Sequence, residues 1–287
     1  MTEATAEFRH RREARSWVRW RGLLPLYLGV AIVLFMVMCS ILAPVIAPHD
    51  PTAQDLLNPL APLGTPSHLL GTDQFGRDVL SRLLYAGRID LLIALGATAV
   101  TLTFGTLFGL ISGYYGGRVD AIMMRVVDLV FAFPFIVLVL AVIAILGPGL
   151  RNMFIAIWLV GWVPYARLIR GEVLVAKRQE YVLAARALDY RGPRIMLRHI
   201  LPNVLTPALV YAVLNAVDNV GIGAALGFLG LGVQDPDAEW GKMIADGQTF
   251  LTTHWWLPTL PGIAIAIFGL GLSLIGDNLA DRLRARS

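Results

Sequence analysis

Few residues of this 287-residue chain have the types and spacing that hydrolytic or metal chemistry would need. Its histidines (His10, His49, His68, His199 and His254) fall in predicted loops or at membrane interfaces, and the sequence has no HExxH pattern or His/Cys cluster. Ser112 and Ser273 are the only candidate nucleophiles in the later apolar segments, where no histidine base accompanies them. We therefore expect no catalytic residue and no metal site, and a membrane-embedded hydrolase is the least favoured function.

The sequence also has no loop of the kind that binds the phosphates of ATP. A Walker A loop requires Gly-x-x-x-x-Gly-Lys followed by Ser or Thr. The single Gly-Lys pair here, Gly241-Lys242, is followed by Met243. If this chain takes part in active transport, another subunit must therefore hydrolyse the ATP.

Asn215, Asp218 and Asn219 form a polar group inside a long apolar segment. Their spacing places them in one sector of a helix. An aspartate that faced lipid there would cost several kcal/mol, so the sector must face protein or water. The three residues either line a translocation path or form an interhelical hydrogen-bond cluster, for example at a subunit interface, and the sequence leaves both open.

The elements that carry these residues are predicted to be membrane-spanning helices. The chain is 56% hydrophobic with a mean hydropathy of +0.66, and only 15% of its residues are charged, against about 25% in soluble domains. Its apolar runs reach the roughly 20 residues that cross a bilayer as helix. They predict six spans, at about 24–47, 89–113, 127–147, 152–170, 204–231 and 258–276.

The basic residues predict the orientation of these spans. Arginines and lysines gather before the first span and after the second, fourth and sixth, whereas segments 48–88 and 232–257 are neutral to acidic. We therefore expect both termini and segment 171–202 in the cytoplasm. Segments 48–88 and 232–257 are expected on the outer side of the membrane. Because the basic residues lie between apolar runs, the net charge of +4 reports topology and does not indicate nucleic-acid binding.

The two predicted outer segments contain acidic residues that a partner could contact. Segment 48–88 is rich in Pro and Gly, and the apolar spacing from Val79 onward predicts a short amphipathic helix that leads into the second span. Asp73 and Asp78 flank Arg77 with a spacing that does not fit a calcium loop. We expect a turn braced by Asp and Arg, or a contact with a protein partner that Asp235, Asp237 and Glu239 could share.

Several long motifs resemble a known transport family. They are LGTDQFGRDVLSRLLYAGRI (70–89), EYVLAARALDYRGPRIMLRHILPN (180–203), GFLGLGVQDPDAEWGKMIADG (227–247) and WWLPTLPGIAIAIFGLGLSLIGDNLADRLR (255–284). In this order they are similar to ABC importer permeases of the oligopeptide/dipeptide/nickel transport family, and within it to the second ("C-type") permease subunit. The resemblance covers residues from about 20 to 284.

The resemblance implies partners and a source of energy. An extracytoplasmic solute-binding protein would deliver solute to a heterodimer of this chain and a second homologous permease. Two ATP-binding-cassette ATPase subunits, which hold ATP and Mg²⁺, would then drive alternating access. This chain would contact membrane lipid, bind no cofactor itself and bind no nucleic acid.

The resemblance also implies that the ATPases dock on residues 178–202. A short helix near Glu180–Leu188 would expose charged and aromatic residues beside small Ala184 and Ala185, so that a partner can approach closely. The family pattern has Gly where this chain has Asp189, and we expect the turn to survive because Asp tolerates positive φ better than most residues. The expected coupling residues are Arg178, Glu180, Tyr181, Ala184, Ala185, Arg186, Asp189, Gly192, His199 and Pro202.

We predict an all-α polytopic membrane protein with six transmembrane helices and an ABC importer type I permease fold, in the bacterial plasma (inner) membrane. Its expected parts are a basic arm (1–22), a first transmembrane helix (23–47), an outer loop (48–88), a five-helix permease core with the coupling loop 171–202 (89–277) and a cytoplasmic tail (278–287). The expected function is import of di- or oligopeptides. The alternatives are import of nickel or another small solute, and a non-transport scaffold that recruits ATPases.

Overall fold

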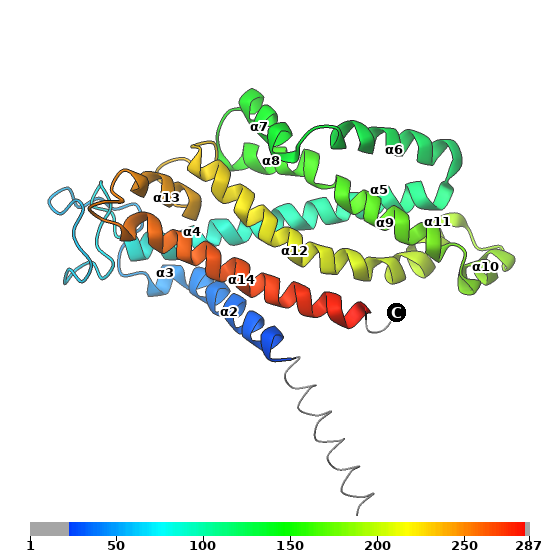
Figure 1. The fold of residues 1–287 in the computed structure, drawn as a ribbon, viewed down its shortest axis with the longest axis horizontal. Coiled ribbons are helices and arrows are strands. Elements are labelled where there is room, and N and C mark those ends of the chain that lie inside the picture. The colour runs from blue at the N-terminus through cyan, green and yellow to red at the C-terminus, as the bar shows by residue number, and fades with distance from the viewer. Residues whose placement is uncertain (1–22, 285–287) are drawn as a thin grey trace, which may run out of the picture.

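The computed structural model describes residues 23–284, and the regular elements in that range are all helices. The predicted basic arm 1–22 and the last three residues of the tail lie outside it. Figure 1 shows an elongated bundle with α13 and the long loop before α4 at one end and α10 at the other. We call these the α13 end and the α10 end.

The described helices have the following bounds in chain order. They are α2 (Leu24–Ile41), α3 (Ala43–Ile46), α4 (Val79–Leu92), the π-helical turn η1 (Ile93–Ala97), α5 (Thr98–Tyr115), α6 (Gly117–Phe131), α7 (Phe135–Leu146), α8 (Leu150–Gly161), α9 (Val163–Ala176), α10 (Glu180–Ala187), α11 (Gly192–Ile195), the π-helical turn η2 (Met196–Ile200), α12 (Leu201–Phe228), α13 (Trp240–Gln248) and α14 (Trp256–Arg284).

Five described helical segments are long and apolar enough to cross a membrane. They are Leu24–Ile41, Val79–Tyr115, Leu150–Ala176, Gly192–Phe228 and Trp256–Arg282. The pair α6 and α7 passes the same criterion only when taken together, and counting this pair as one span gives the six that the sequence predicts. The helix expected from Val79 begins there but continues without interruption into the second span.

The span expected at 127–147 is not one straight helix. α6 ends at Phe131, α7 begins at Phe135, and the two axes are bent by 83°. Pro134 precedes α7 in an extended conformation, with ψ 132°. Proline has no N–H for the helical ladder and disfavours helix at the residue before it, so the break falls at this position.

Glycines let α5 and α9 approach to backbone contact, as close packing of small residues in a membrane bundle predicts. A Cβ atom on Gly105 would overlap the carbonyl oxygen of Trp162, and one on Gly109 would overlap that of Ala166. The apolar core continues along this contact toward the α10 end, where Leu110, Tyr165 and Ile169 are buried. A second cluster at the α13 end joins α4, α12, α13 and α14.

Candidate functional site

One face of α10 is anchored in the bundle and the other is exposed. Val182 is fully buried and Ala185 is 4% exposed, and both join the core cluster that includes residues of α9, η2 and α12. The opposite face exposes Glu180, Tyr181, Ala184 and Arg186, and Arg178 is exposed directly before the helix. The helix therefore presents a fixed surface at the end of the bundle (Figure 1).

Ala185 does not lie on the exposed surface where we expected it. Its side chain belongs to the core cluster around Val173 and Ile195, so it cannot contact a docked protein in this arrangement. Val182 is three residues before it and shares the same helix face, which has to be buried for so short a helix to be held. Of the two alanines expected on the exposed surface, Ala184 is exposed and Ala185 is not.

The exposed face of α10 is more apolar than we predicted. Tyr181 is 40% exposed, Leu183 is 50% exposed and Leu188 is 68% exposed. Tyr181, Ala184 and Leu188 follow each other at spacings of three and four, so they share one helix face. The spacing of these residues in the sequence is typical of an apolar helix face. The charged residues around them led us to predict a polar surface instead.

Asp189 adopts the left-handed conformation that ends α10. Its φ is 57°, and its N–H donates to the carbonyl of Arg186 at 2.9 Å. The N–H of Tyr190 donates to the carbonyl of Ala185 at 3.2 Å. These two bonds form a Schellman cap, whose left-handed position is usually glycine. The turn expected at this position is therefore present, and Asp189 fills it.

Replacing Asp189 by glycine should stabilise the protein, by about 0.5–1 kcal/mol, because glycine has no Cβ to strain the left-handed conformation. Asp189→Ala is the matched control and should lower stability, since alanine carries a Cβ and cannot hydrogen-bond locally. Thermal unfolding of the three proteins in one detergent would measure this. Equal midpoints, or a lower midpoint for the glycine variant, would contradict it.

Two of the expected coupling residues face the bundle rather than the solvent. A Cβ atom on Gly192 would lie 3.3 Å from the ring of Tyr114, at the end of α5. The ring of His199 is half-buried, with its centroid 5.8 Å from that of Tyr190. Arg186 contacts the same Tyr114 ring in a cation–π geometry, at 5.5 Å from its centroid. The contacts of Gly192 and Arg186 with Tyr114 hold α10 and α11 against the end of α5.

Pro202 lies in the first turn of α12, as a proline at the start of the fifth span predicts. The helical path runs from Gly192 to Phe228, and the π-helical turn η2 directly precedes Leu201 and Pro202. π-turns widen a helix locally and accommodate a residue that cannot donate to the ladder. Residues 192–200 are therefore continuous with α12.

A partly buried ion pair joins α6 to α9. Arg170 of α9 donates from Nε and Nη2 to the two carboxylate oxygens of Asp120 on α6, each at 2.6 Å. Ser112 of α5 also hydrogen-bonds to Asp120, and Lys177 donates to the carbonyl of Gly113 at 2.8 Å. Bidentate pairs of this kind fix geometry strongly. Sequence reasoning missed the contacts of Arg170 and Lys177 because their partners are 50 and 64 residues away in the chain.

The polar sector of α12 divides into two parts. Asn219 donates to Thr98 at 2.9 Å and to Asn215 at 3.3 Å, and the hydroxyl of Tyr165 donates to Asn215 at 3.0 Å. Asn215 and Asn219 therefore belong to an interhelical hydrogen-bond cluster. Asp218 is exposed on the chain surface. An aspartate at such a position in a membrane helix requires water or a partner protein.

Four of the six outer residues expected to contact a receptor are buried. Asp73, Arg77, Asp78 and Glu239 are each at most 8% exposed, whereas Asp235 and Asp237 are exposed. Arg77 pairs with Asp73 at 2.6 Å, which is the braced turn that the sequence offered as one alternative. The buried four hold loops together and offer no side chain to a partner in this arrangement. Only the two exposed aspartates keep that expected role.

Asp235 links the braced turn to α13. Its carboxylate accepts from Arg77 at 3.0 Å and lies 3.2 Å from Nζ of Lys242. Partial burial would raise its pKa, but the hydrogen bonds from Arg77 and Lys242 outweigh this and hold the pKa below its ordinary value. Asp235 therefore stays charged and keeps the two outer segments together.

Glu239 caps the first turn of α13 from a buried position. Its carboxylate accepts from the N–H groups of Gly241 at 2.7 Å and Lys242 at 2.9 Å. Burial raises the pKa of Glu239 above the ordinary 4.5, although these hydrogen bonds oppose the shift. Folding therefore favours the protonated acid, and the stabilisation present below pH 4.5 is lost as the pH rises through the raised pKa.

We expect Glu239→Gln to flatten the pH dependence of stability above pH 4.5, because an amide cannot ionise when buried. Thermal unfolding of both proteins at a series of pH values between 4.5 and 8 would show a smaller decline for the variant. Parallel curves would contradict the assignment, whatever the offset between them from the altered cap.

Comparisons with known proteins agree with the helical architecture. A di/tripeptide transport system permease protein of Pseudomonas aeruginosa is 41% identical over 89% of this chain and 86% of its own length. A probable D,D-dipeptide transport system permease protein of Escherichia coli is 38% identical over 99% of this chain and 96% of its own length. A chain of the MetNI methionine ABC transporter in an inward-facing conformation shares the fold, with a TM-score of 0.52 and 20% identity over 72% of this chain and 96% of that chain.

Two family profiles match most of the sequence between them. The profile of the N-terminal transmembrane domain of oligopeptide transport permease C matches residues 26–62. The profile of the binding-protein-dependent transport system inner membrane component matches residues 105–287, which include α10, the capped turn at Asp189 and the polar sector of α12. This chain is therefore a multi-pass membrane protein that belongs to the family of binding-protein-dependent transport system inner membrane components.

Proposed function

We propose that this chain is a permease subunit of an ATP-binding-cassette importer that carries di- or oligopeptides into the cytoplasm. The observation that supports it most is the exposed face of α10, where Tyr181, Leu183 and Leu188 surround Ala184. Exposed apolar side chains rimmed by charges are typical of protein interaction sites. The substrate class rests on the names of the relatives, which are described as dipeptide and oligopeptide permeases.

The ATPases would act on the bundle through the contacts of α10. A partner that displaces α10 would also displace α5, because Arg186 and Gly192 both lie against Tyr114. It would displace α9 through the shared core cluster, and α6 through the pair between Arg170 and Asp120. Packed helices move as units, so closure of the ATPases would be transmitted along the membrane spans. ATP and Mg²⁺ would be bound by the ATPases, and this chain would have no catalytic residue.

The chain would work beside a second, homologous permease. The exposed Asp218 supports this, because a carboxylate on α12 is costly in lipid and is satisfied by a partner chain or by water in a path between two chains. The α10 end would face the cytoplasm, with both termini, in keeping with the basic residues around it. The α13 end, with Asp235 and Asp237 exposed, would receive the solute-binding protein.

Purification from the host membranes in mild detergent, followed by mass spectrometry, is the first test. We expect a second permease and two ATPase subunits to accompany the chain. The purified assembly, in lipid vesicles with its solute-binding protein, should hydrolyse ATP faster when di- or oligopeptides are added and should move those peptides across the membrane. Hydrolysis that responds only to Ni²⁺ would favour the small-solute alternative. Hydrolysis without any solute dependence or transport would favour the scaffold.

A further inference from the structure

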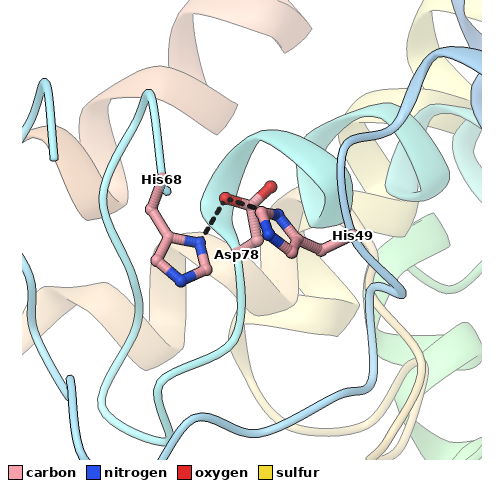
Figure 2. Close-up of side chains that lie close together, drawn as sticks. All are labelled: His49, His68 and Asp78. Carbon is pink, nitrogen blue, oxygen red and sulfur yellow. Dashed lines mark hydrogen bonds and ion pairs between the residues drawn. The ribbon is translucent and has the colours of Figure 1, made fainter. Parts of the chain in front are cut away.

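Three side chains from separate parts of the α13 end converge on one point (Figure 2). His49 follows α3, His68 lies in the middle of the long loop, and Asp78 precedes α4. Each offers one ligand atom, and these atoms all lie within 4.8 Å of one another. The sequence did not suggest a metal site here, because the three residues are 19 and 10 positions apart and only the fold of the loop brings them together.

The distances within this cluster suit a small cation. Nδ1 of His68 lies 2.9 Å from Oδ1 of Asp78, and Nδ1 of His49 lies 3.8 Å from the same oxygen. Ligand atoms around a tetrahedral zinc ion are roughly 3.3 Å apart, given bond lengths of about 2.0–2.1 Å. The two observed distances fall on either side of that value. Small side-chain rotations would therefore place all three ligand atoms around one ion.

The carboxylate is held in the orientation that a metal ligand needs. Oδ2 of Asp78 accepts from the backbone N–H of Ser81 at 2.8 Å and from its hydroxyl at 2.7 Å. Oδ1 is thereby directed at the two imidazoles. The hydroxyl oxygen of Ser81 also accepts from the backbone N–H of His49 at 3.1 Å, which positions the third ligand. Hydrogen bonds from groups behind the ligands are a regular feature of metal sites.

The cluster is open to solvent at one of its three residues, His49. The side chain of Asp78 is fully buried and that of His68 is 7% exposed, but that of His49 is 38% exposed. An ion could enter past His49, and a water molecule could complete its coordination. Two imidazoles and one carboxylate favour zinc or a similar transition metal, since calcium and magnesium prefer oxygen ligands alone.

We propose that His49, His68 and Asp78 bind one divalent cation of the zinc type. The ion would cross-link the segment after α3, the long loop and the start of α4, which supply residues 10 or more positions apart in the chain. Segment 47–78 has only turns and isolated bridges, so a bound ion would be its strongest cross-link. The proposal does not depend on which solute the chain transports.

The test is zinc binding to the purified, untagged chain in detergent after treatment with EDTA. Calorimetry with ZnCl₂ should show one ion per chain, and zinc should raise the thermal unfolding midpoint. His49→Ala is the informative variant, because this residue is the exposed ligand and should be dispensable for folding without metal. We expect its zinc affinity to fall at least 100-fold, with an unchanged midpoint in EDTA. His254→Ala, at another histidine of the α13 end, should bind zinc as the unmodified chain does.

Cobalt substitution provides a second readout. Co²⁺ bound by two imidazoles, a carboxylate and water in tetrahedral geometry gives intense visible absorption, which should be absent in His49→Ala. Failure of the unmodified chain to bind zinc would overturn the proposal and leave the cluster as a hydrogen bond between His68 and Asp78. Unchanged affinity in His49→Ala would overturn it as well.

Discussion

Replacing Ala184 by glutamate is expected to separate this chain from its ATPases and to reduce peptide transport at least tenfold. Ala184 is exposed at the centre of the apolar face of α10, between Tyr181 and Leu188. A glutamate there would place a larger, charged side chain where an apolar partner surface has to approach. A loss of about 1.4 kcal/mol of binding energy already corresponds to a tenfold weaker complex, and substitutions at the centre of an interface often exceed this.

The same substitution at the opposite end of the bundle provides the control. Ala53 is exposed in the long loop, so Ala53→Glu adds the same charge far from α10. Both variants should keep the thermal unfolding midpoint of the unmodified chain, because neither position is buried. The measurements are recovery of ATPase subunits with the purified chain and uptake of a labelled peptide. Full recovery and uptake with Ala184→Glu would show that the ATPases dock elsewhere.

Ala185 cannot replace Ala184 as the site of this substitution. It is adjacent to Ala184 in sequence and identical in type, but it packs against the core cluster. Ala185→Glu would bury a charge and should unfold the α10 segment, so loss of binding in that variant would say nothing about docking. Of these two alanines, only Ala184 can be used to test docking of the ATPases.

The sequence predicted the helices and their order well because apolar length and proline position depend on local chemistry. The start of α4 at Val79 and the turn at Asp189 both follow from residues within a few positions of the feature. The bend of 83° between α6 and α7 did not follow, because a proline indicates an interruption and tertiary packing sets the angle.

The functional contacts that the sequence missed join residues distant in the chain. Asp120 and Arg170, Asn219 and Thr98, and the cluster around Asp78 are brought together only by the packing of the bundle. Charge pattern placed Glu239 on the surface and left Asp73 and Arg77 either in a braced turn or in contact with a partner, since loop residues of these types are usually exposed. Their burial depends on the ion pair between Asp73 and Arg77 and on the helix cap made by Glu239. A single sequence does not show these contacts.

Arg77→Ala should lower the stability of the protein strongly. The guanidinium is 2% exposed, pairs through Nε with Asp73 at 2.6 Å and through Nη1 with Asp235 at 3.0 Å, and lies over the ring of Phe75. Removal of one partner from a buried ion pair costs about 3–5 kcal/mol, because the remaining charge keeps no adequate counterpart. For a chain of this size we expect the thermal midpoint to fall by roughly 10 °C.

Arg88 is the matched control, since it is an exposed arginine on α4 outside this cluster, and Arg88→Ala should change the stability by less than about 0.5 kcal/mol. Limited proteolysis should locate the damage, with new cleavage between residues 47 and 78 in Arg77→Ala only. Arg77→Lys should recover only part of the loss, because an ammonium cannot reach Asp73 and Asp235 with the planar fork of a guanidinium. If Arg77→Ala were as stable as Arg88→Ala, the neighbouring Arg82, whose Nε is 3.5 Å from Asp73, would have to neutralise that carboxylate alone. The double variant Arg77→Ala/Arg82→Ala would then unfold where neither single variant does.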